Sequence, residues 1–264
     1  IGEERFRREH ECEFLIFDET LISSLVLADM EGTAPVETTG QVRWYKRPTP
    51  GHTYMVSLDP SMGTGGDFAA IQVFELPTFE QVGEWHHNQT PMNQQVRILQ
   101  GINKHIHDTI MEKDSTATPQ IFYSMENNTI GEAALMRVMD IGEENIMGMF
   151  LSEPIRKGHR RKFRRGFNTT AKHKIDACTK FKELVENDKM KINSQLLISE
   201  MKDFVATGLS YKAKPGQHDD LVSACLLMTR MMKVLADFDP KIFEKWTDRT
   251  SEITPMPIFG SFTG

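Results

Sequence analysis

Short apolar runs separated by Gly, Pro and charged residues predict a first group of β-strands early in the chain. Tyr54–Pro60 is an apolar run that ends at Asp-Pro and a glycine-rich turn, and two further strands are expected at Phe68–Leu76 and Gln81–His86. Because the connecting turns are short, the three strands are expected to pair as an antiparallel meander.

Helical and strand patterns alternate after this meander. From Met92 to about Lys113, apolar residues recur every three or four positions, which is typical of an amphipathic helix. Pattern and capping residues predict the remaining elements: strands at Gln120–Met125 and Ile146–Leu151, and helices at Gly131–Met139, from Thr169 or Thr170 to Val185, at Gln195–Val205 and from His218 to about Leu235. This order predicts an α/β domain whose mixed sheet has helices on both faces.

Two segments outside this pattern set the expected domain limits. Residues 31–50 are rich in Gly, Thr and Pro, which predicts an irregular linker, and we place a boundary near residue 45. The last 27 residues have three prolines and little periodicity. The sequence therefore predicts an N-terminal segment of residues 1–45, a main domain of residues 46–237 and a peripheral tail of residues 238–264.

Composition narrows the class of protein. The chain has 264 residues, 39% hydrophobic and 26% charged, which is enough for a sizeable core and excludes intrinsic disorder as the main state. It contains no apolar run near the roughly 18 residues of a membrane span and no signal peptide, so we expect no membrane partner. Its three cysteines are widely spaced, which favours a reducing, intracellular compartment. Because the chain begins with Ile1, we expect a fragment or a processed protein.

Charge is distributed unevenly along the chain. The net charge is −6, but residues 1–40 carry ten Asp and Glu against three Arg, so the rest is close to neutral. Within that remainder, Arg156–Arg165 contains seven Arg and Lys and no acid. Such a block is either a flexible basic loop without a partner or a binding site for a polyanion, and its density favours the second interpretation.

Acidic residues stand at the ends of predicted elements. Asp59 closes the first strand, Glu126 closes the strand after the first helix, and Asp219 and Asp220 open the last helix. In a mixed α/β sheet these ends meet at one rim, where carboxylates repel one another unless cations neutralise them. Hard oxygen ligands without His or Cys suit Mg²⁺ or Mn²⁺. Taken singly, Asp59 is equally a turn residue before Pro and Asp219 a helix cap, but metal ions beside a basic block fit phosphodiester chemistry.

Three segments, in order, resemble the C-terminal nuclease domain of the large terminase subunit of T4-like tailed bacteriophages. These segments are Ser57–Asp67, Tyr123–Asn128 and His218–Val222. Two further stretches support the resemblance, namely Phe6–Phe14, which is similar to the end of the family's ATPase region, and Gly166–Thr170 with Lys174. Each motif is weak alone, whereas three in this order are fairly specific.

The resemblance implies a ribonuclease H-like fold in which a carboxylate triad binds divalent metal, two Mg²⁺ or Mn²⁺ ions, and cuts DNA. On this chain the triad is Asp59, Glu126 and one of Asp219 and Asp220, and both of the last two are expected to reach metal. We favour Asp220 as the catalytic member because it lies beside Ala224 on the flank of the apolar stripe, whereas Asp219 points nearly away from the core.

Two residues near these acids, Asp67 and His218, each have two interpretations. Asp67 matches a recurrent acidic position of the family, yet a turn residue that caps the glycine-rich loop fits it equally well. His218 could orient a water or contact a phosphate, although a solvent-exposed residue at a helix start is the more ordinary interpretation. Both are expected beside the metal site rather than as its main ligands.

Basic residues are expected to follow the DNA backbone, and phosphate contacts carry no sequence information. They are Arg156, Lys157, Arg160, Arg161, Lys162, Arg164 and Arg165, with Lys172 and Lys174 as an extension that a solvated helix face explains equally well. We therefore expect an endonuclease that cuts double-stranded DNA with little sequence specificity.

By resemblance, cutting occurs during viral genome packaging, at initiation and termination, in the cytoplasm of the infected bacterial host. The implied partners are the portal protein, the small terminase subunit and the ATPase domain of the same full-length chain. The chain lacks a G-x-x-x-x-G-K-[ST] phosphate loop, so we expect no ATPase activity from it. Two alternatives stay open: another ribonuclease H-like nuclease such as a junction resolvase, and a non-catalytic DNA-binding or motor-docking module.

Overall fold

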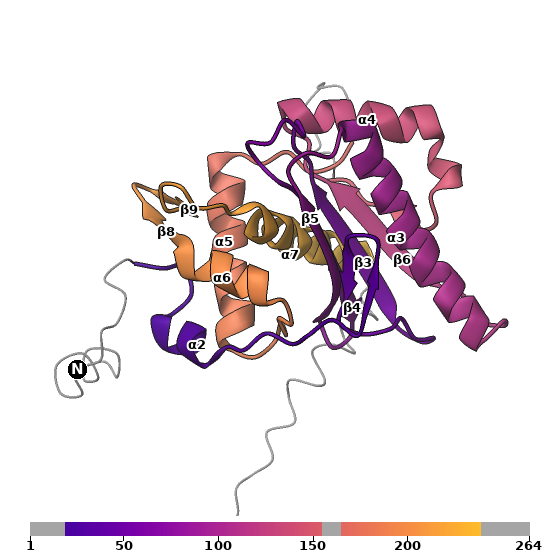
Figure 1. Cartoon of the computed structure of the whole chain (residues 1–264), viewed down its shortest axis with the longest axis horizontal. Helices are drawn as coiled ribbons and strands as arrows, with labels where there is room; N and C mark the ends of the chain where they lie inside the picture. Colours follow the sequence, from indigo (N-terminus) through magenta and orange to yellow (C-terminus); the bar gives the residue numbers. More distant parts are fainter. Residues whose placement is uncertain (1–18, 155–164, 239–264) are drawn as a thin grey trace, which may run out of the picture.

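A seven-stranded mixed sheet forms the centre of the computed structural model, which describes residues 19–154 and 165–238 (Figure 1). The strand order is β1-β2-β5-β4-β3-β6-β7. The strands are β1 (Glu37–Thr39), β2 (Val42–Trp44), β3 (Thr53–Asp59), β4 (Ala69–Leu76), β5 (Glu80–His87), β6 (Gln120–Met125) and β7 (Met149–Phe150). Pairing is antiparallel from β1 to β3 and parallel from β3 to β7, which confirms the predicted meander followed by crossovers.

Helices cover both faces of this sheet, as the sequence predicts (Figure 1). One face carries α3 (Met92–Lys113) and α4 (Thr129–Ile141), and the other carries α2 (Ser24–Asp29), α5 (Ala171–Glu186), α6 (Gln195–Asp203) and α7 (Asp220–Phe238). The central strand β3 is buried from Thr53 to Leu58 because successive side chains enter opposite cores. Met55 belongs to the α7-side core, whereas Val56 belongs to the α3-side core.

The parallel register of β3 and β6 fixes where two predicted acids emerge. Leu58 lies opposite Met125, so Asp59 and Glu126 follow side by side at the same edge of the sheet. The backbone N–H of Glu126 donates to the carbonyl oxygen of Leu58 at 3.1 Å, which extends the pairing one residue further. Adjacent strand ends therefore hold both carboxyl groups.

Helix α7 packs across β3 and β4. The buried Oγ of Ser57 donates to the carbonyl oxygen of Ala224 at 2.8 Å, which pins the helix to the central strand. Because Asp220 lies only one turn before Ala224, this contact brings the start of α7 close to the end of β3.

Residues 31–50 are not the irregular linker that their composition predicts. Within them, β1 and β2 form a hairpin around Gly40 (φ 60°), and β2 adds to the sheet beside β5. Trp44 is buried over Gly83, where a Cβ atom would lie 2.9 Å from the indole ring. The strands have three residues each, so their pairing depends on a distant partner and leaves little local pattern. The sheet thus starts before residue 45.

A second departure follows α6. The helix predicted over Gln195–Val205 ends at Asp203, and β8 (Phe204–Thr207) and β9 (Ser210–Ala213) form a small separate hairpin with Gly208 in its turn (φ 61°). The strand predicted at Ile146–Leu151 is reduced to the two residues of β7, after a short 3-10 turn at Glu143–Asn145. No helix in the described part of the chain is long and apolar enough to cross a membrane. The predicted tail from residue 239 onward lies outside the described residues.

Candidate active site

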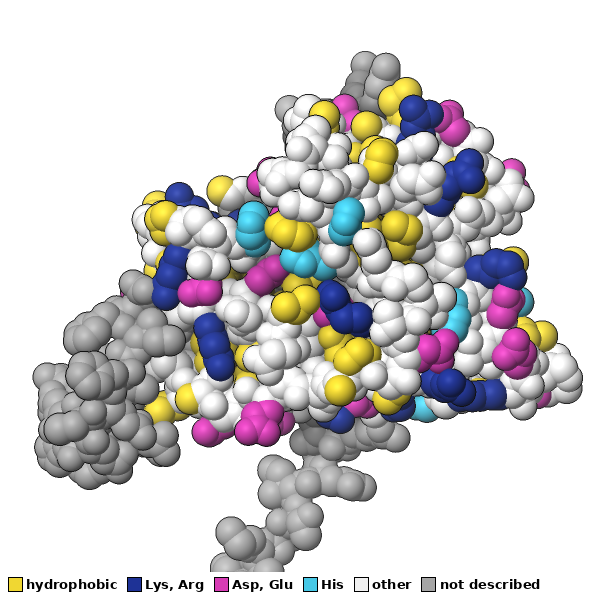
Figure 2. Space-filling model, viewed as in Figure 1, with side chains coloured by type: hydrophobic (Ala, Val, Ile, Leu, Met, Phe, Trp, Pro, Cys, Tyr) yellow, Lys and Arg dark blue, Asp and Glu magenta, His cyan; other side chains and the backbone are white. Residues whose placement is uncertain are grey.

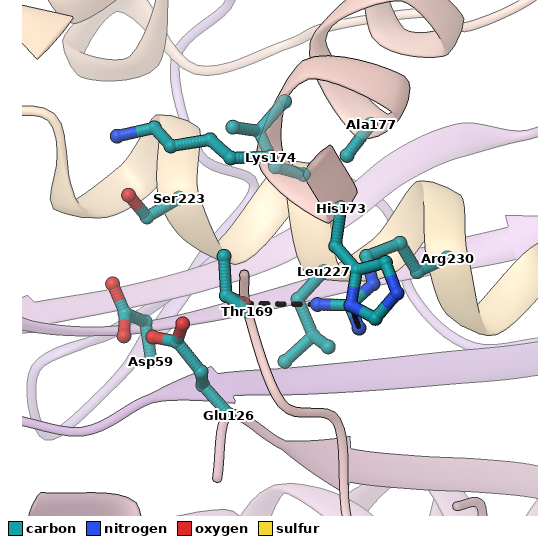
Figure 3. A pocket seen from close by; sticks show the side chains of 10 residues that line it. Asp59, Glu126, Thr169, His173, Lys174, Ala177, Ser223, Leu227 and Arg230 are labelled. Atoms are coloured by element: carbon teal, nitrogen blue, oxygen red, sulfur yellow. Dashed lines mark hydrogen bonds between the residues drawn. The ribbon is translucent and has the colours of Figure 1, made fainter. Parts of the chain in front are cut away.

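Asp59 and Glu126 form the centre of the candidate site. Their carboxyl groups lie side by side at the ends of β3 and β6 (Figure 3). Burial raises the pKa of Asp59 well above its ordinary value, and the charge and hydrogen bond of Glu126 raise it further. Two carboxylates placed this closely favour a shared proton or a cation between them.

Local structure fixes the position of Glu126. The Nδ2 of Asn128 donates to Oε2 of Glu126 at 3.1 Å, while its Oδ1 accepts from the N–H of Gly131 and so caps α4. A Cβ on Gly131 would lie 1.8 Å from the carbonyl oxygen of Glu126, so only glycine fits there. The first turn of α4 is therefore packed directly against the backbone of this acid.

Asp219 and Asp220 lie at the N-terminus of α7. The backbone carbonyl of Asp219 accepts the N–H of Ser223 at 2.7 Å, and its Oδ2 accepts from the N–H of Ala213 and lies 3.9 Å from Nζ of Lys174. Asp219 is thus the residue immediately before the helix, with a side chain already engaged by two groups.

Asp220 is the more buried of the pair, with 15% of its side chain exposed against 27% for Asp219. Its carboxylate lies near the backbone N–H of Phe68, and its Oδ2 lies 3.6 Å from Nδ1 of His218. Burial and then the charge of Asp219 raise the pKa of Asp220 to about 6, against the opposite effects of His218 and the Phe68 amide. Asp220 and Asp219 also raise the pKa of Asp59, so all four acids share one electrostatic environment.

The donor set fits hard divalent cations, although its side chains are not arranged around an ion. Within residues 19–154 and 165–238, no three His, Cys, Asp or Glu side chains stand close enough to hold one metal ion. Asp59 and Glu126 lie side by side instead. Carboxylate oxygens without His or Cys suit Mg²⁺ or Mn²⁺, and the raised pKa of Asp59 marks a place where positive charge is favoured. Holding an ion requires these carboxylates to turn toward a common point.

A cavity of about 150 Å³ adjoins the Asp59–Glu126 pair (Figure 3). Residues of the loop before α5, of α5 and of α7 form the rest of its wall: Thr169, His173, Lys174, Ala177, Ser223, Leu226, Leu227 and Arg230. The acids thus face a wall that carries two cationic side chains and a histidine.

Arg230 ties that wall together. Its Nη1 donates to Oγ1 of Thr169 at 2.9 Å, and its Nη2 donates to the carbonyl oxygen of Asn168 at 3.0 Å and pairs with Glu153. The guanidinium also lies 5.2 Å from the ring centroid of Phe167. Since Phe167 pairs with the backbone of β6 beside Glu126, Arg230 links α7 to the strand end that presents the acid.

Asp67 and His218, the other two residues predicted beside the site, lie around the start of α7, together with His86. Asp67 is exposed at the end of the glycine-rich loop and acts on Asp220 by its charge. The ring centroid of His218 lies 4.7 Å from that of Phe68 in an edge contact, and His86 stacks on Phe68 with ring centroids 4.1 Å apart. Figure 2 shows histidine side chains gathered beside hydrophobic ones over this part of the molecule.

Most residues of the predicted DNA-binding set lie outside the described residues, namely Arg156, Lys157, Arg160, Arg161, Lys162 and Arg164. Arg165 forms an ion pair with Glu143 and lies 5.6 Å from the ring centroid of Phe150. Lys172 is exposed on α5, and Lys174 lines the cavity. The structure thus brings Lys174 to the carboxylates, whereas Arg165 is already engaged by an acid.

Sequence reasoning missed two residues of this region. Arg230 is the only charged residue in the run Leu221–Met232, which is a readable signal in an otherwise uncharged helix. Glu200 lies in α6 between the buried Leu197 and Met201, and its side chain is 10% exposed. The only sequence signal for Glu200 is its place as an acid among apolar residues of α6. Those apolar residues by themselves predict only a packed helix.

Comparisons with known proteins agree with this geometry. A family model described as the terminase RNaseH-like domain matches residues 56–231. The magnesium-bound large terminase nuclease of thermophilic phage G20c has a TM-score of 0.59 at 17% identity, over 81% of this chain and 98% of that chain. The large terminase nuclease domain of Thermus phage P74-26 has a TM-score of 0.54 at 17% identity, over 76% and 92%.

A more distant solved structure has the same fold. The manganese-soaked, inhibitor-bound terminase nuclease domain of human cytomegalovirus has a TM-score of 0.50 at 13% identity, over 85% of this chain and 98% of that chain. At these identities the structural likeness concerns the fold alone. Together with the family match, it confirms the predicted ribonuclease H-like fold and the resemblance to terminase nuclease domains.

Proposed function

The chain belongs to the terminase RNaseH-like domain family, and from this we propose that it is an endonuclease that uses divalent metal ions to cut double-stranded DNA during viral genome packaging. The observation that carries the proposal is the placement of the Asp59 and Glu126 carboxyl groups side by side, where the charges of Asp220 and Asp219 also raise the pKa of Asp59. Four acids gathered this closely repel one another when ionised, and bound cations would offset that repulsion.

Asp59, Glu126 and Asp220 are proposed as the catalytic ligands of Mg²⁺ or Mn²⁺, with Asp219 as a further ligand. Two ions at such a site would lower the pKa of an attacking water and offset charge on the leaving oxygen. The residues themselves contribute placement, because Asp59 and Glu126 are fixed by adjacent strands and Asp220 by the Phe68 amide. The burial of Asp220 makes it the stronger candidate of the α7 pair.

Other residues are proposed to support this centre. The charge of Asp67 raises the pKa of Asp220, and the charge of His218 lowers it. Lys174, on the cavity wall, and Lys172, exposed beside it, are proposed DNA contacts together with the basic residues 156–165. These contacts are to phosphates, so cutting is expected to be largely independent of sequence.

The biological setting is proposed from the family. The domain would cut the DNA concatemer when packaging starts and ends, in the cytoplasm of the infected bacterial host. Its partners would be the ATPase domain of the full-length chain, the portal protein and the small terminase subunit. A T4-like origin stays a prediction.

Plasmid cleavage with Mg²⁺ or Mn²⁺ tests the proposal. We expect Asp59→Asn, Glu126→Gln and Asp220→Asn each to lower the nicking rate by more than about 100-fold, because each removes a metal ligand. Asp108→Asn, an exposed acid paired with Lys104 on α3, is the matched control and should cut like the wild type.

Three other outcomes would contradict the proposal or favour a different function. Undiminished nicking by all three variants would exclude the triad. DNA binding by the wild type without cleavage under any metal would favour a binding or docking module. A strong preference for four-way junctions over linear duplex would favour a junction resolvase.

A further inference from the structure

Glu200 is a buried acid that the proposed metal site does not use. It lies on α6, which packs against α7, and its Oε2 accepts the backbone N–H of Val222 at 3.1 Å. The N–H of Leu221 lies near this carboxyl group as well and favours its ionised form. Both amides belong to the first turn of α7, where backbone donors have no partner within their own helix.

Two features distinguish Glu200 from a residue that only fills space between helices. Burying an acid costs free energy unless its oxygens are bonded, and apolar neighbours such as Leu197 and Met201 would pack this surface without that cost. The backbone hydrogen bond that Glu200 accepts comes from Val222, two residues after Asp220. The position of the acidic pair relative to β3 therefore depends on a side chain from another helix.

The start of α7 is held from a second side as well. The N–H of Phe68 lies near the carboxylate of Asp220, and the Phe68 ring contacts both His86 and His218. The Nε2 of His86 lies 3.7 Å from Oε1 of Glu200. The Phe68 amide thus orients the carboxylate of Asp220, and Glu200 fixes the backbone that carries it.

We propose that Glu200 is a positioning residue that holds the first turn of α7 by accepting the N–H of Val222, so that Asp219 and Asp220 are directed at Asp59 and Glu126 for metal binding. The inference rests on the proposed function of that site. Burial, together with the charges of Asp220 and Asp219, raises the pKa of Glu200 to about 9, so its uncharged form dominates at neutral pH. An oxygen acceptor at the right reach, rather than a negative charge, is what the role requires.

Three substitutions separate this role from the alternatives. Glu200→Gln keeps an oxygen at the same reach, Glu200→Asp withdraws it by one CH₂ group, and Glu200→Ala removes it. Loss of a group that orients metal ligands typically costs about 10–100-fold in affinity, so we expect Mn²⁺ to bind Glu200→Ala at least about tenfold more weakly and Glu200→Gln within about threefold of the wild type. Glu200→Asp should fall between them.

Mn²⁺ binding is measured on the whole chain by titration calorimetry or by the electron paramagnetic resonance signal of free Mn²⁺. Thermal melting in EDTA runs in parallel, and plasmid nicking is measured against Mn²⁺ concentration. Glu183→Ala, an exposed acid paired with Lys180 on α5, is the matched control. If Glu200→Ala lacks a cooperative melting transition, the Mn²⁺ affinities of Glu200→Gln and Glu200→Asp are compared instead, and weaker binding by Glu200→Asp supports the positioning role.

The outcomes distinguish the two proposals. Wild-type affinity in Glu200→Ala, or an equal loss in Gln and Ala, overturns the positioning role while the nuclease function stands. A wild type that binds Mn²⁺ without cutting DNA overturns the function, and the role of Glu200 is still decided by the binding series. A wild type that binds no Mn²⁺ overturns both.

Discussion

Helices α3 and α7 lie on opposite faces of the same strands and have similar amphipathic patterns, yet they bury different polar groups. α3 buries neutral amides: Gln95 bonds the backbone of Ser61, and Asn103 donates to the carbonyl oxygen of Met147 at 2.9 Å. Its charged residues pair on the surface, as Lys104 does with Asp108. On α7, by contrast, Asp220 and Arg230 are both largely buried.

The difference teaches how one helix supports a fold while another also builds a site. A buried amide satisfies loop backbone at modest cost, whereas a buried charge has to be compensated by a partner or a ligand. Arg230 is compensated by Glu153, Thr169 and Asn168. The acids at the start of α7 are compensated only in part, which is why we propose them as cation ligands.

Removing Arg230 should have the largest effect on this comparison. Arg230→Met leaves Glu153 unpaired and frees the segment Asn168–Thr169, so we expect the free energy of unfolding to fall by about 3 kcal/mol. Lys104→Met on α3 removes an exposed pair and should cost about 0.5 kcal/mol or less. Urea denaturation measures both. Equal effects would mean that burial of charge on α7 has no special energetic role.

Two helical glycines on the α3 side sharpen the comparison, because only one of them touches the site. Gly131→Ala places a Cβ against the carbonyl oxygen of Glu126, and we expect a loss of about 2–3 kcal/mol together with reduced nicking. Gly101→Ala in α3 meets open space, so it should gain about 0.5–1 kcal/mol from helix propensity.

Thermal or urea unfolding and plasmid cleavage of the two glycine variants decide the point. A Gly131→Ala protein with wild-type stability would show that the backbone at Glu126 can shift without cost. Loss of nicking in Gly101→Ala would show that α3 is more than a support.

The sequence predicts much of this molecule because many of its signals are local. Asp59, Glu126 and the Asp219–Asp220 pair each stand at the boundary of an element with a clear hydrophobic period, so both the elements and the acids at their ends can be found. The parallel pairing of β3 with β6 then follows from the alternation of strands and helices.

What the sequence leaves out depends on contacts between distant segments. The β1–β2 hairpin joins the sheet only through its pairing with β5, and Trp44 gains its burial from Gly83. Glu200 acquires its partners from the packing of α6 on the start of α7. No period in the local sequence encodes these contacts, since each needs the register of another element.

The smallest expected effect is on the pH dependence of stability in EDTA. It tests whether the buried carboxyl group of Asp220 lacks a compensating positive charge. The pKa of Asp220 is raised from 3.8 to about 6 in the folded protein, chiefly by burial. A raised carboxyl pKa means that the folded state binds the proton more tightly, so this stabilisation is full below pH 3.8 and is lost as pH rises through 6.

Asp220→Asn removes that penalty, and we expect it to be more stable than the wild type by about 2 kcal/mol at pH 7.5, with the difference vanishing near pH 4. On α3, the hydrogen bond from Lys104 lowers the pKa of Asp108, so Asp108→Asn should bring no gain at pH 7.5. Thermal melting of both variants across pH 4–8 provides the measurement. Because a cation would offset the ionised carboxylates, millimolar Mn²⁺ should raise the stability of the wild type at pH 7.5 and reverse its order with Asp220→Asn; an order unchanged by Mn²⁺ would mean that α7 buries its acid for a reason other than metal.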